Sequence, residues 1–206
     1  MRGMSRRTVR DVIVGLFVAS AFGAASAATL TSEPTQSTAP LDSVTTPLLV
    51  IRDFKDGLAG VCASRPEVRL SVDRDDSFPT ERVLVVDYPT PTKDPAGRDV
   101  QCAAQNHDWT AGHAIAFQIK PAHALRFSVS FLDRHRVAYT SWSELKGGMW
   151  QMVRLPFGEM RPNPFFQPPG AETGAPLDVS AVERIAFAPQ DQSPGRLSIR
   201  SFVVTK

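Results

Sequence analysis

Large apolar and polar side chains alternate along most of residues 108–204, and this pattern constrains the fold more than any other feature. One run places Leu125, Phe127, Val129 and Phe131 at odd positions and Arg126, Ser128 and Ser130 at even positions. An alternation with a period of two puts one set of side chains on each face of a β-strand. Repeated runs of this kind, separated by Gly and Pro turns, predict an all-β fold, an antiparallel β-sandwich of the jelly-roll type.

The 17 prolines support this prediction, because proline breaks long helices and punctuates short elements. The alternation predicts strands at Leu48–Phe54, Val68–Asp73, Arg82–Tyr88, Arg98–Ala104, His113–Lys120, Leu125–Asp133, Val137–Ser143, Trp150–Pro156, Arg184–Ala188 and Arg196–Val204. The longest connection, residues 161–176, is rich in proline and is expected to cross between the two sheets.

The first 27 residues have the composition of a signal peptide. A basic start carrying four arginines precedes the apolar run Val12–Ala21, and Ala25-Ser26-Ala27 fits a cleavage site. We expect export to the periplasm or the outside of the cell, by the general route or by the twin-arginine route that Arg6-Arg7 loosely resembles. Residues 28–46, rich in Ser, Thr and Pro, are predicted to be a flexible spacer, which leaves 47–206 as one binding domain.

The charge balance changes when the signal peptide is removed. The first 27 residues hold four of the 23 basic residues and one of the 21 acidic ones, which leaves 19 basic and 20 acidic residues. A nearly neutral domain argues against a nucleic-acid partner, which would require a basic surface. The rest of the chain has no apolar stretch long enough for a membrane span.

Cys62 and Cys102 are the two cysteines of the chain. In an exported protein a disulfide between them is favoured, and closing such a loop would add about 3–4 kcal/mol. Two buried free thiols are the alternative.

Several motifs follow one another in a fixed order. They are Asp53-Phe54-Lys55-Asp56-Gly57, Asp108-Trp109-Thr110, the segment 150–157, and Leu177-Asp178 leading into Ile185-Ala186-Phe187. In this order they resemble the galactose-binding-domain-like jelly rolls, in particular the family 11 carbohydrate-binding modules and the complex I intermediate-associated protein 30 domains. The resemblance covers about Leu48 to Val204. It implies a β-sandwich with a concave sheet face, which in the family 11 modules grips a β-glucan chain.

The resemblance also implies structural calcium, but the last strand departs from the family pattern. Arg200 stands where the family carries a carboxylate, and calcium requires six to eight oxygen ligands. We therefore expect no cofactor, with Asp53 and Asp56 pairing with Arg200. A structural calcium is the alternative.

A glycan-binding face requires aromatic platforms and polar groups that pair with hydroxyls. The residues expected to line a ligand groove are Arg126, Ser128, Asp133, Tyr139, Trp142 and Arg154, with Tyr88 as a further aromatic candidate. The rigid donor fork of Arg and the two acceptor oxygens of Asp suit paired hydroxyls. The alternative is an ordinary solvated outer face. Trp109, Trp150 and the phenylalanines of the alternating strands are expected in the core.

No motif of a catalytic family is evident. The sequence lacks a nucleophile elbow, a phosphate loop and a dinucleotide fingerprint, and the acidic cluster Asp73-Arg74-Asp75-Asp76 is interpreted as a solvated turn. We therefore expect a non-catalytic exported module that binds a glycan or polysaccharide. One alternative is a protein-interaction or assembly module of the cell envelope that uses Pro164-Phe165-Phe166. Another is an enzyme whose site assembles from distant residues.

Overall fold

The computed structural model describes residues 47–90, 98–104 and 108–206. The predicted signal peptide (1–27) and spacer (28–46) lie outside the described residues. Within them the chain forms strands joined by turns, with a short 3₁₀ helix at Phe157–Glu159. No helix of this described part is long and apolar enough to cross a bilayer.

Sheet A is built around the last strand of the chain. Its strands are β1 (Leu49–Arg52), β3 (Arg69–Asp75), β4 (Phe78–Tyr88), β6 (Ala114–Pro121), β9 (Gln151–Pro156) and β12 (Gly195–Thr205). The order is β3-β4-β12-β6-β9, with β1 also pairing with β12, and every pairing is antiparallel.

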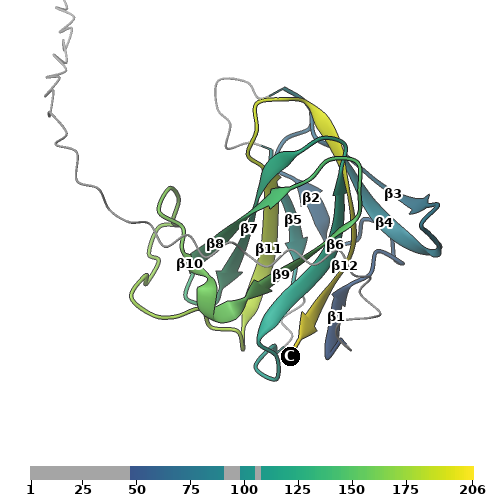
Figure 1. The fold of residues 1–206 in the computed structure, drawn as a ribbon. Coiled ribbons are helices and arrows are strands. Elements are labelled where there is room, and N and C mark those ends of the chain that lie inside the picture. Colours follow the sequence, from purple (N-terminus) through teal and green to yellow (C-terminus); the bar gives the residue numbers. More distant parts are fainter. Residues whose placement is uncertain (1–46, 91–97, 105–107) are drawn as a thin grey trace, which may run out of the picture. The chain divides into compact units, whose positions relative to one another are not determined.

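Sheet B forms the second layer of the sandwich. Its strands are β2 (Val61–Ala63), β5 (Val100–Ala103), β7 (Leu125–Asp133), β8 (Ala138–Leu145), β10 (Arg161–Pro162) and β11 (Val182–Pro189). The order β10-β8-β7-β11-β5-β2 can be followed across one layer in Figure 1. The predicted antiparallel β-sandwich is thus confirmed.

The core lies between the two sheets and is rich in aromatic rings. Phe117 of β6 and Phe127 of β7 face each other with ring centroids 6.3 Å apart, which joins the two layers. Phe131 and Phe187 are also buried, as the alternation predicted, and so is Trp109, as the family resemblance implied. Burying an aromatic side chain removes a large apolar area from water, so these contacts are a principal source of stability.

The predicted strands all find a counterpart, and the structure adds two that the sequence did not indicate. These are β2 and β10, which have three and two residues and are too short to show an alternation. The predictions for Trp150 and Tyr88 were wrong. Trp150 is only half-buried and packs outside the core against Phe78, at 5.1 Å between centroids, whereas Tyr88 is buried.

Candidate functional site

The face of sheet B that points away from the core carries a mixed set of small, polar and aromatic side chains. In β7 the core takes Leu125, Phe127, Val129 and Phe131, so the intervening residues point outward. Register then fixes their neighbours: Arg126 pairs with Glu144, Ser128 with Trp142, and Ser130 with Thr140. On the other side of β7, Ser130 pairs with Ala186 and Ser128 with Ala188. We call this surface the outer face of sheet B.

An aromatic corner, formed by Trp142 and Phe165, stands at the β8 side of this face. The two ring centroids are 6.5 Å apart and the planes meet at 80°. The guanidinium carbon of Arg126 lies 5.6 Å from the centroid of the Trp142 ring, a cation–π contact. Phe165 is 87% exposed, so most of its ring is open to a ligand.

The centre of the face is low because its side chains are small. Ser128 and Ser130 of β7 lie beside Ala188 and Ala186 of β11, and none of them rises far above the backbone. Gln190 borders this strip: its Nε2 donates to Ser128 Oγ at 2.8 Å. A ligand can therefore approach the sheet closely here, next to the aromatic corner.

The far side of the same face holds a shallow depression of about 320 Å³. Its lining comes from β2, β5, β11 and the residues beside them: Gly60, Val61, Cys62, Gln101, Ala103, Glu183 and Arg184. β8 and β2 are separated by four strand-to-strand steps, so this depression and the aromatic corner are about 19 Å apart in the direction across the strands. The lining is mainly apolar, with Arg184 donating to Gln101 Oε1 at 2.6 Å.

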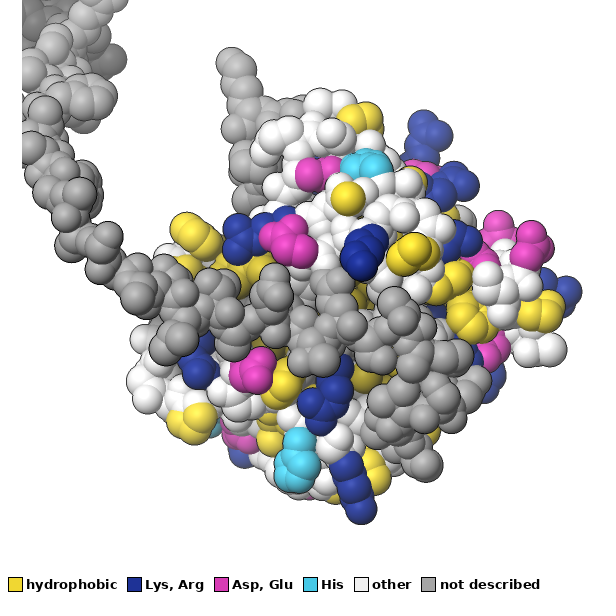
Figure 2. Space-filling model, viewed as in Figure 1, with side chains coloured by type: hydrophobic (Ala, Val, Ile, Leu, Met, Phe, Trp, Pro, Cys, Tyr) yellow, Lys and Arg dark blue, Asp and Glu magenta, His cyan; other side chains and the backbone are white. Residues whose placement is uncertain are grey.

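Charge on the outer face is balanced. Arg126 and Glu144, both well exposed, face each other with Nε and Oε1 3.7 Å apart. Elsewhere on the molecule, in the view of Figure 2, basic and acidic side chains are also interspersed among the described residues. Such a surface does not select strongly for a charged ligand.

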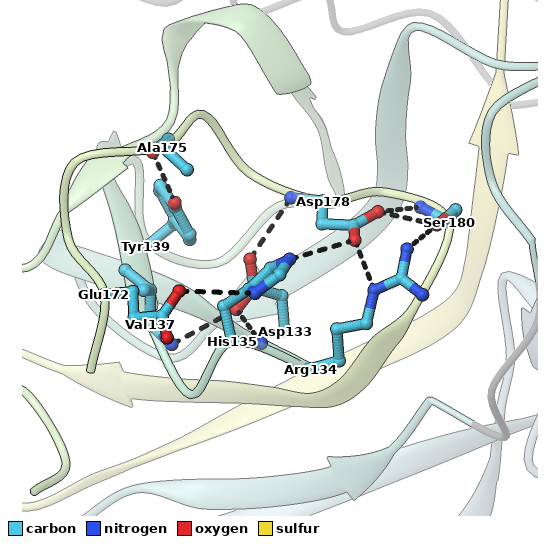
Figure 3. A network of polar contacts seen from close by, with 9 residues as sticks. All are labelled: Asp133, Arg134, His135, Val137, Tyr139, Glu172, Ala175, Asp178 and Ser180. Atoms are coloured by element: carbon cyan, nitrogen blue, oxygen red, sulfur yellow. Dashed lines mark hydrogen bonds and ion pairs between the residues drawn. The ribbon is translucent and has the colours of Figure 1, made fainter. Parts of the chain in front are cut away.

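Three of the six predicted ligand residues come together on this face, namely Arg126, Ser128 and Trp142. Asp133 does not, because it is fully buried and its carboxylate holds the β7–β8 turn. Oδ1 accepts from the backbone N–H of His135 (3.0 Å) and Val137 (3.1 Å), and Oδ2 accepts from Asp178 N–H at 3.2 Å (Figure 3). The alternation already placed Asp133 in phase with Phe131 on the core side.

Tyr139 and Arg154 are also elsewhere. Tyr139 pairs with Phe131, so its ring faces the core at 1% exposure, and its hydroxyl donates to the carbonyl of Ala175 at 2.7 Å (Figure 3). Arg154 belongs to β9 of sheet A and donates to the terminal Lys206 carbonyl at 2.8 Å. Neither lies on the outer face of sheet B, so the structure does not bring them together with Arg126, Ser128 and Trp142.

The two cysteines are free thiols, so the predicted disulfide is not present. They lie on neighbouring strands but point to opposite faces: Cys102 is in the core, and Cys62 is exposed on the outer face. Burial raises the pKa of Cys102 to about 12, which keeps that thiol protonated. A disulfide would require one of the two strands to rotate its side chains by half a turn.

The position at which the family resemblance implied calcium is taken by a guanidinium. Arg200, 7% exposed, pairs with Glu81 through Nε and Nη2 and donates from Nη1 to Gln118 Oε1 at 2.8 Å. Asp53, which was expected to pair with Arg200, instead contacts Lys55 at 2.7 Å. Within the described ranges no three His, Cys, Asp or Glu side chains are grouped as metal ligands. These contacts do not fit a calcium ion beside Arg200.

Phe165 is the candidate-site residue that the sequence reasoning missed, since it was considered for an apolar protein contact or as a plug of the sandwich end and not for a ligand site. A signal was present: two adjacent phenylalanines in a proline-rich loop have no strand whose core face they would join. The position of Phe165 beside Trp142 depends on how β10 and the following loop fold back along β8, which the sequence does not show.

Comparison with known proteins gives a fold but no family. No family model matches the chain, and no curated protein matches it. Among solved structures, a family 11 carbohydrate-binding module from Clostridium thermocellum in complex with a β-1,3-1,4-mixed-linked tetrasaccharide superposes with a TM-score of 0.60. The two are 19% identical, over 76% of this chain and 94% of that one.

Two further structures from the same organism agree. The family 11 module of the cellulosomal cellulase Lic26A-Cel5E gives a TM-score of 0.59 at 19% identity, over 79% of this chain and 95% of that one. A family 30 module of the cellulase Cel9D-Cel44B gives 0.52 at 15% identity, over 79% and 94%. The protein therefore has the β-sandwich fold of these carbohydrate-binding modules, as the motifs predicted.

Proposed function

We propose that this protein is a non-catalytic, exported glycan-binding module and that it binds its ligand on the outer face of sheet B. The observation that carries the proposal is the grouping of Trp142, Phe165 and Arg126 beside a strip of small residues. The shared fold supports it, because similar sandwiches include a family 11 module solved with a tetrasaccharide.

The chemistry of this face suits a sugar. The C–H-bearing face of a pyranose ring is apolar and packs against an exposed aromatic ring such as Phe165. Arg126 supplies donors at the edge of that platform, and Gln190 adds an amide beside Ser128. A few polar groups around an apolar platform are typical of a preformed ligand site.

The dimensions suit a chain rather than a single sugar. The aromatic corner and the depression beside Cys62 lie on one continuous face, about 19 Å apart across the strands. An extended, uncharged oligosaccharide laid across β8, β7, β11 and β5 would reach from one to the other. The balanced charges of the face favour an uncharged glycan.

A glycan array is the test of this proposal. The protein should be retained by one class of uncharged glycans, and the Trp142→Ala and Phe165→Ala variants should lose that retention while remaining folded. Unchanged retention by both variants would place the binding site elsewhere. Retention of no glycan would reject the proposed function.

A protein-interaction or assembly module of the envelope is the second candidate. It is favoured by the adjacent Phe165 and Phe166, which are 87% and 62% exposed. Contiguous exposed apolar groups often mark a protein contact. A pull-down from envelope extract, compared with one in which both phenylalanines are replaced, separates this candidate from the first: a protein captured only by the unmodified chain, with no glycan retained, supports it.

A further inference from the structure

The segment that carries the exposed phenylalanines is held by polar contacts and little else. β10 pairs with β8 for only two residues, Arg161 with Thr140 and Pro162 with Tyr139. The chain then leaves the sheet at Asn163, whose N–H donates to the carbonyl of Ala138 at 2.7 Å. Phe165 and Phe166 follow, and both are too exposed for apolar burial to fix their position.

Gln167 brings the chain back to the same point on β8. Its Oε1 accepts from Ala138 N–H at 2.9 Å, and its Nε2 donates to the Ala138 carbonyl at 2.8 Å. The side-chain amide thus occupies the place that the peptide of a neighbouring strand would fill. Its second N–H donates to the Asn163 carbonyl at 3.0 Å. This bond holds the two ends of the loop 163–167 together.

Asn163 holds the inside of this loop. Its Oδ1 accepts from the N–H groups of Phe165 (2.9 Å) and Phe166 (3.3 Å), an Asx turn that sets the backbone direction of both. Pro164 lies between Asn163 and Phe165, and its ring fixes φ, which further restricts the backbone of the turn. The pair of phenylalanines is therefore presented by a preorganised loop rather than by a flexible one.

We propose that Gln167 is the positioning residue of the binding site: by standing in for a strand peptide on Ala138, it fixes Phe165 in the open aromatic corner before ligand arrives. This inference rests on the proposed glycan-binding function. It adds that the site is rigid because Gln167 holds the loop that carries Phe165. Ordering a loop costs about 1–2 kcal/mol per residue, and a loop ordered in advance does not incur that cost on binding.

The chain contains a matched control for this clamp. At the opposite end of β8, Gln151 makes the same pair of bonds with Lys146: Oε1 accepts from Lys146 N–H at 2.9 Å and Nε2 donates to its carbonyl at 2.6 Å. That clamp holds the β8–β9 turn, which carries neither Phe165 nor Phe166. A Gln→Glu change at either position removes an amide donor. Gln151 is 3% exposed and donates to one carbonyl, whereas Gln167 is half-buried and donates to two, so urea unfolding must first show that both variants remain folded.

The experiment compares Gln167→Glu with Gln151→Glu in the full chain, with a β-1,3-1,4-linked tetrasaccharide as the probe. A carboxylate has no N–H to donate and would face the carbonyls of Ala138 and Asn163. We expect Gln167→Glu to bind roughly tenfold more weakly than the wild type near neutral pH. The Gln151→Glu variant should bind like the wild type. Acidification should narrow the Gln167→Glu deficit, because a protonated carboxyl again has a donor.

Two further readouts separate this inference from the proposed function. NMR order parameters of the Phe165 and Phe166 amides, measured without any glycan, should fall in Gln167→Glu and stay unchanged in Gln151→Glu. Equal order parameters, or an equal loss of affinity in the two variants, would overturn the positioning role. If Phe165→Ala binds as tightly as the wild type, the proposed site fails, and if the wild type binds no glycan of the array, the proposed function fails; in both cases the order parameters still decide the role of Gln167.

Discussion

The ring of Phe165 meets the ring of Trp142 edge to face, with their centroids 6.5 Å apart. The first residue comes from the proline-rich loop and the second from the middle of β8, so the contact joins a loop to the sheet that supports it. Arg126 covers part of the Trp142 ring, which leaves Phe165 as the more accessible platform.

Replacing Phe165 by Ala separates binding from folding. Because the side chain is 87% exposed, the free energy of unfolding should change by no more than about 0.5 kcal/mol. The affinity for a glycan should fall roughly tenfold, as expected when a central aromatic contact is removed. Urea unfolding and calorimetric titration measure the two quantities. A large loss of stability with unchanged affinity would contradict both expectations.

The pair of Arg200 with Glu81 should contribute to stability in the place of a metal. Arg200→Met leaves Glu81 without its guanidinium, and we expect the free energy of unfolding to fall by about 2 kcal/mol. The double variant with Glu81→Leu should recover part of this loss, because no uncompensated charge then remains. Urea unfolding of the single and double variants provides the measurement.

Calcium should leave this protein unchanged. The guanidinium of Arg200 in β12 stands where the family resemblance implied a calcium ligand. Adding calcium or a chelator should therefore not shift the melting temperature of the wild-type chain. A calcium-dependent rise in melting temperature would show that the ion binds, and that the contacts of Arg200 do not replace it.

Asp178 should make stability depend on acid pH. Hydrogen bonds from Ser180 and Arg134 hold the pKa of its carboxyl at about 2, below the ordinary value of 3.8 (Figure 3). The folded-state pKa is the lower one, so this stabilisation is complete above pH 4 and is lost as pH falls through about 2. Asp178→Asn should reduce the dependence of the unfolding free energy on pH in that range.

The two thiols should react differently with a water-soluble disulfide reagent. Cys62 is exposed, while burial raises the pKa of Cys102 to about 12. One thiol per native chain should therefore be titrated, and a second should appear only after unfolding. Cys62→Ser should remove the fast reaction. Finding no reactive thiol in the unfolded, unreduced chain would instead demonstrate a disulfide.

The sequence predicted the sandwich well because alternation is a direct record of burial. In β7 every second residue is buried, Phe127 and Phe131 among them. The residues between them, such as Arg126 and Ser128, are thereby correctly assigned to the outer face. Short strands such as β10 were not predicted, because two residues are too few to show an alternation.

The site was only half predictable, for a physical reason. Alternation tells which side of its own strand a residue occupies, but it does not tell which sheet the strand joins. Arg154 was expected to line a groove together with Arg126, yet its strand belongs to sheet A. Tyr139 was judged by its polar neighbours, and its register with Phe131 places it in the core. The clamp of Gln167 on Ala138 depends on tertiary contact and leaves no periodic signal.

The most direct test of the account is an NMR titration of the isotope-labelled chain with uncharged oligosaccharides, beginning with the β-1,3-1,4-linked tetrasaccharide. We predict saturable shifts of the Trp142 indole and of amides in residues 126–130 and 163–167. Shifts confined to sheet A, or none with any oligosaccharide of the panel, would contradict the claim that the outer face of sheet B binds a glycan.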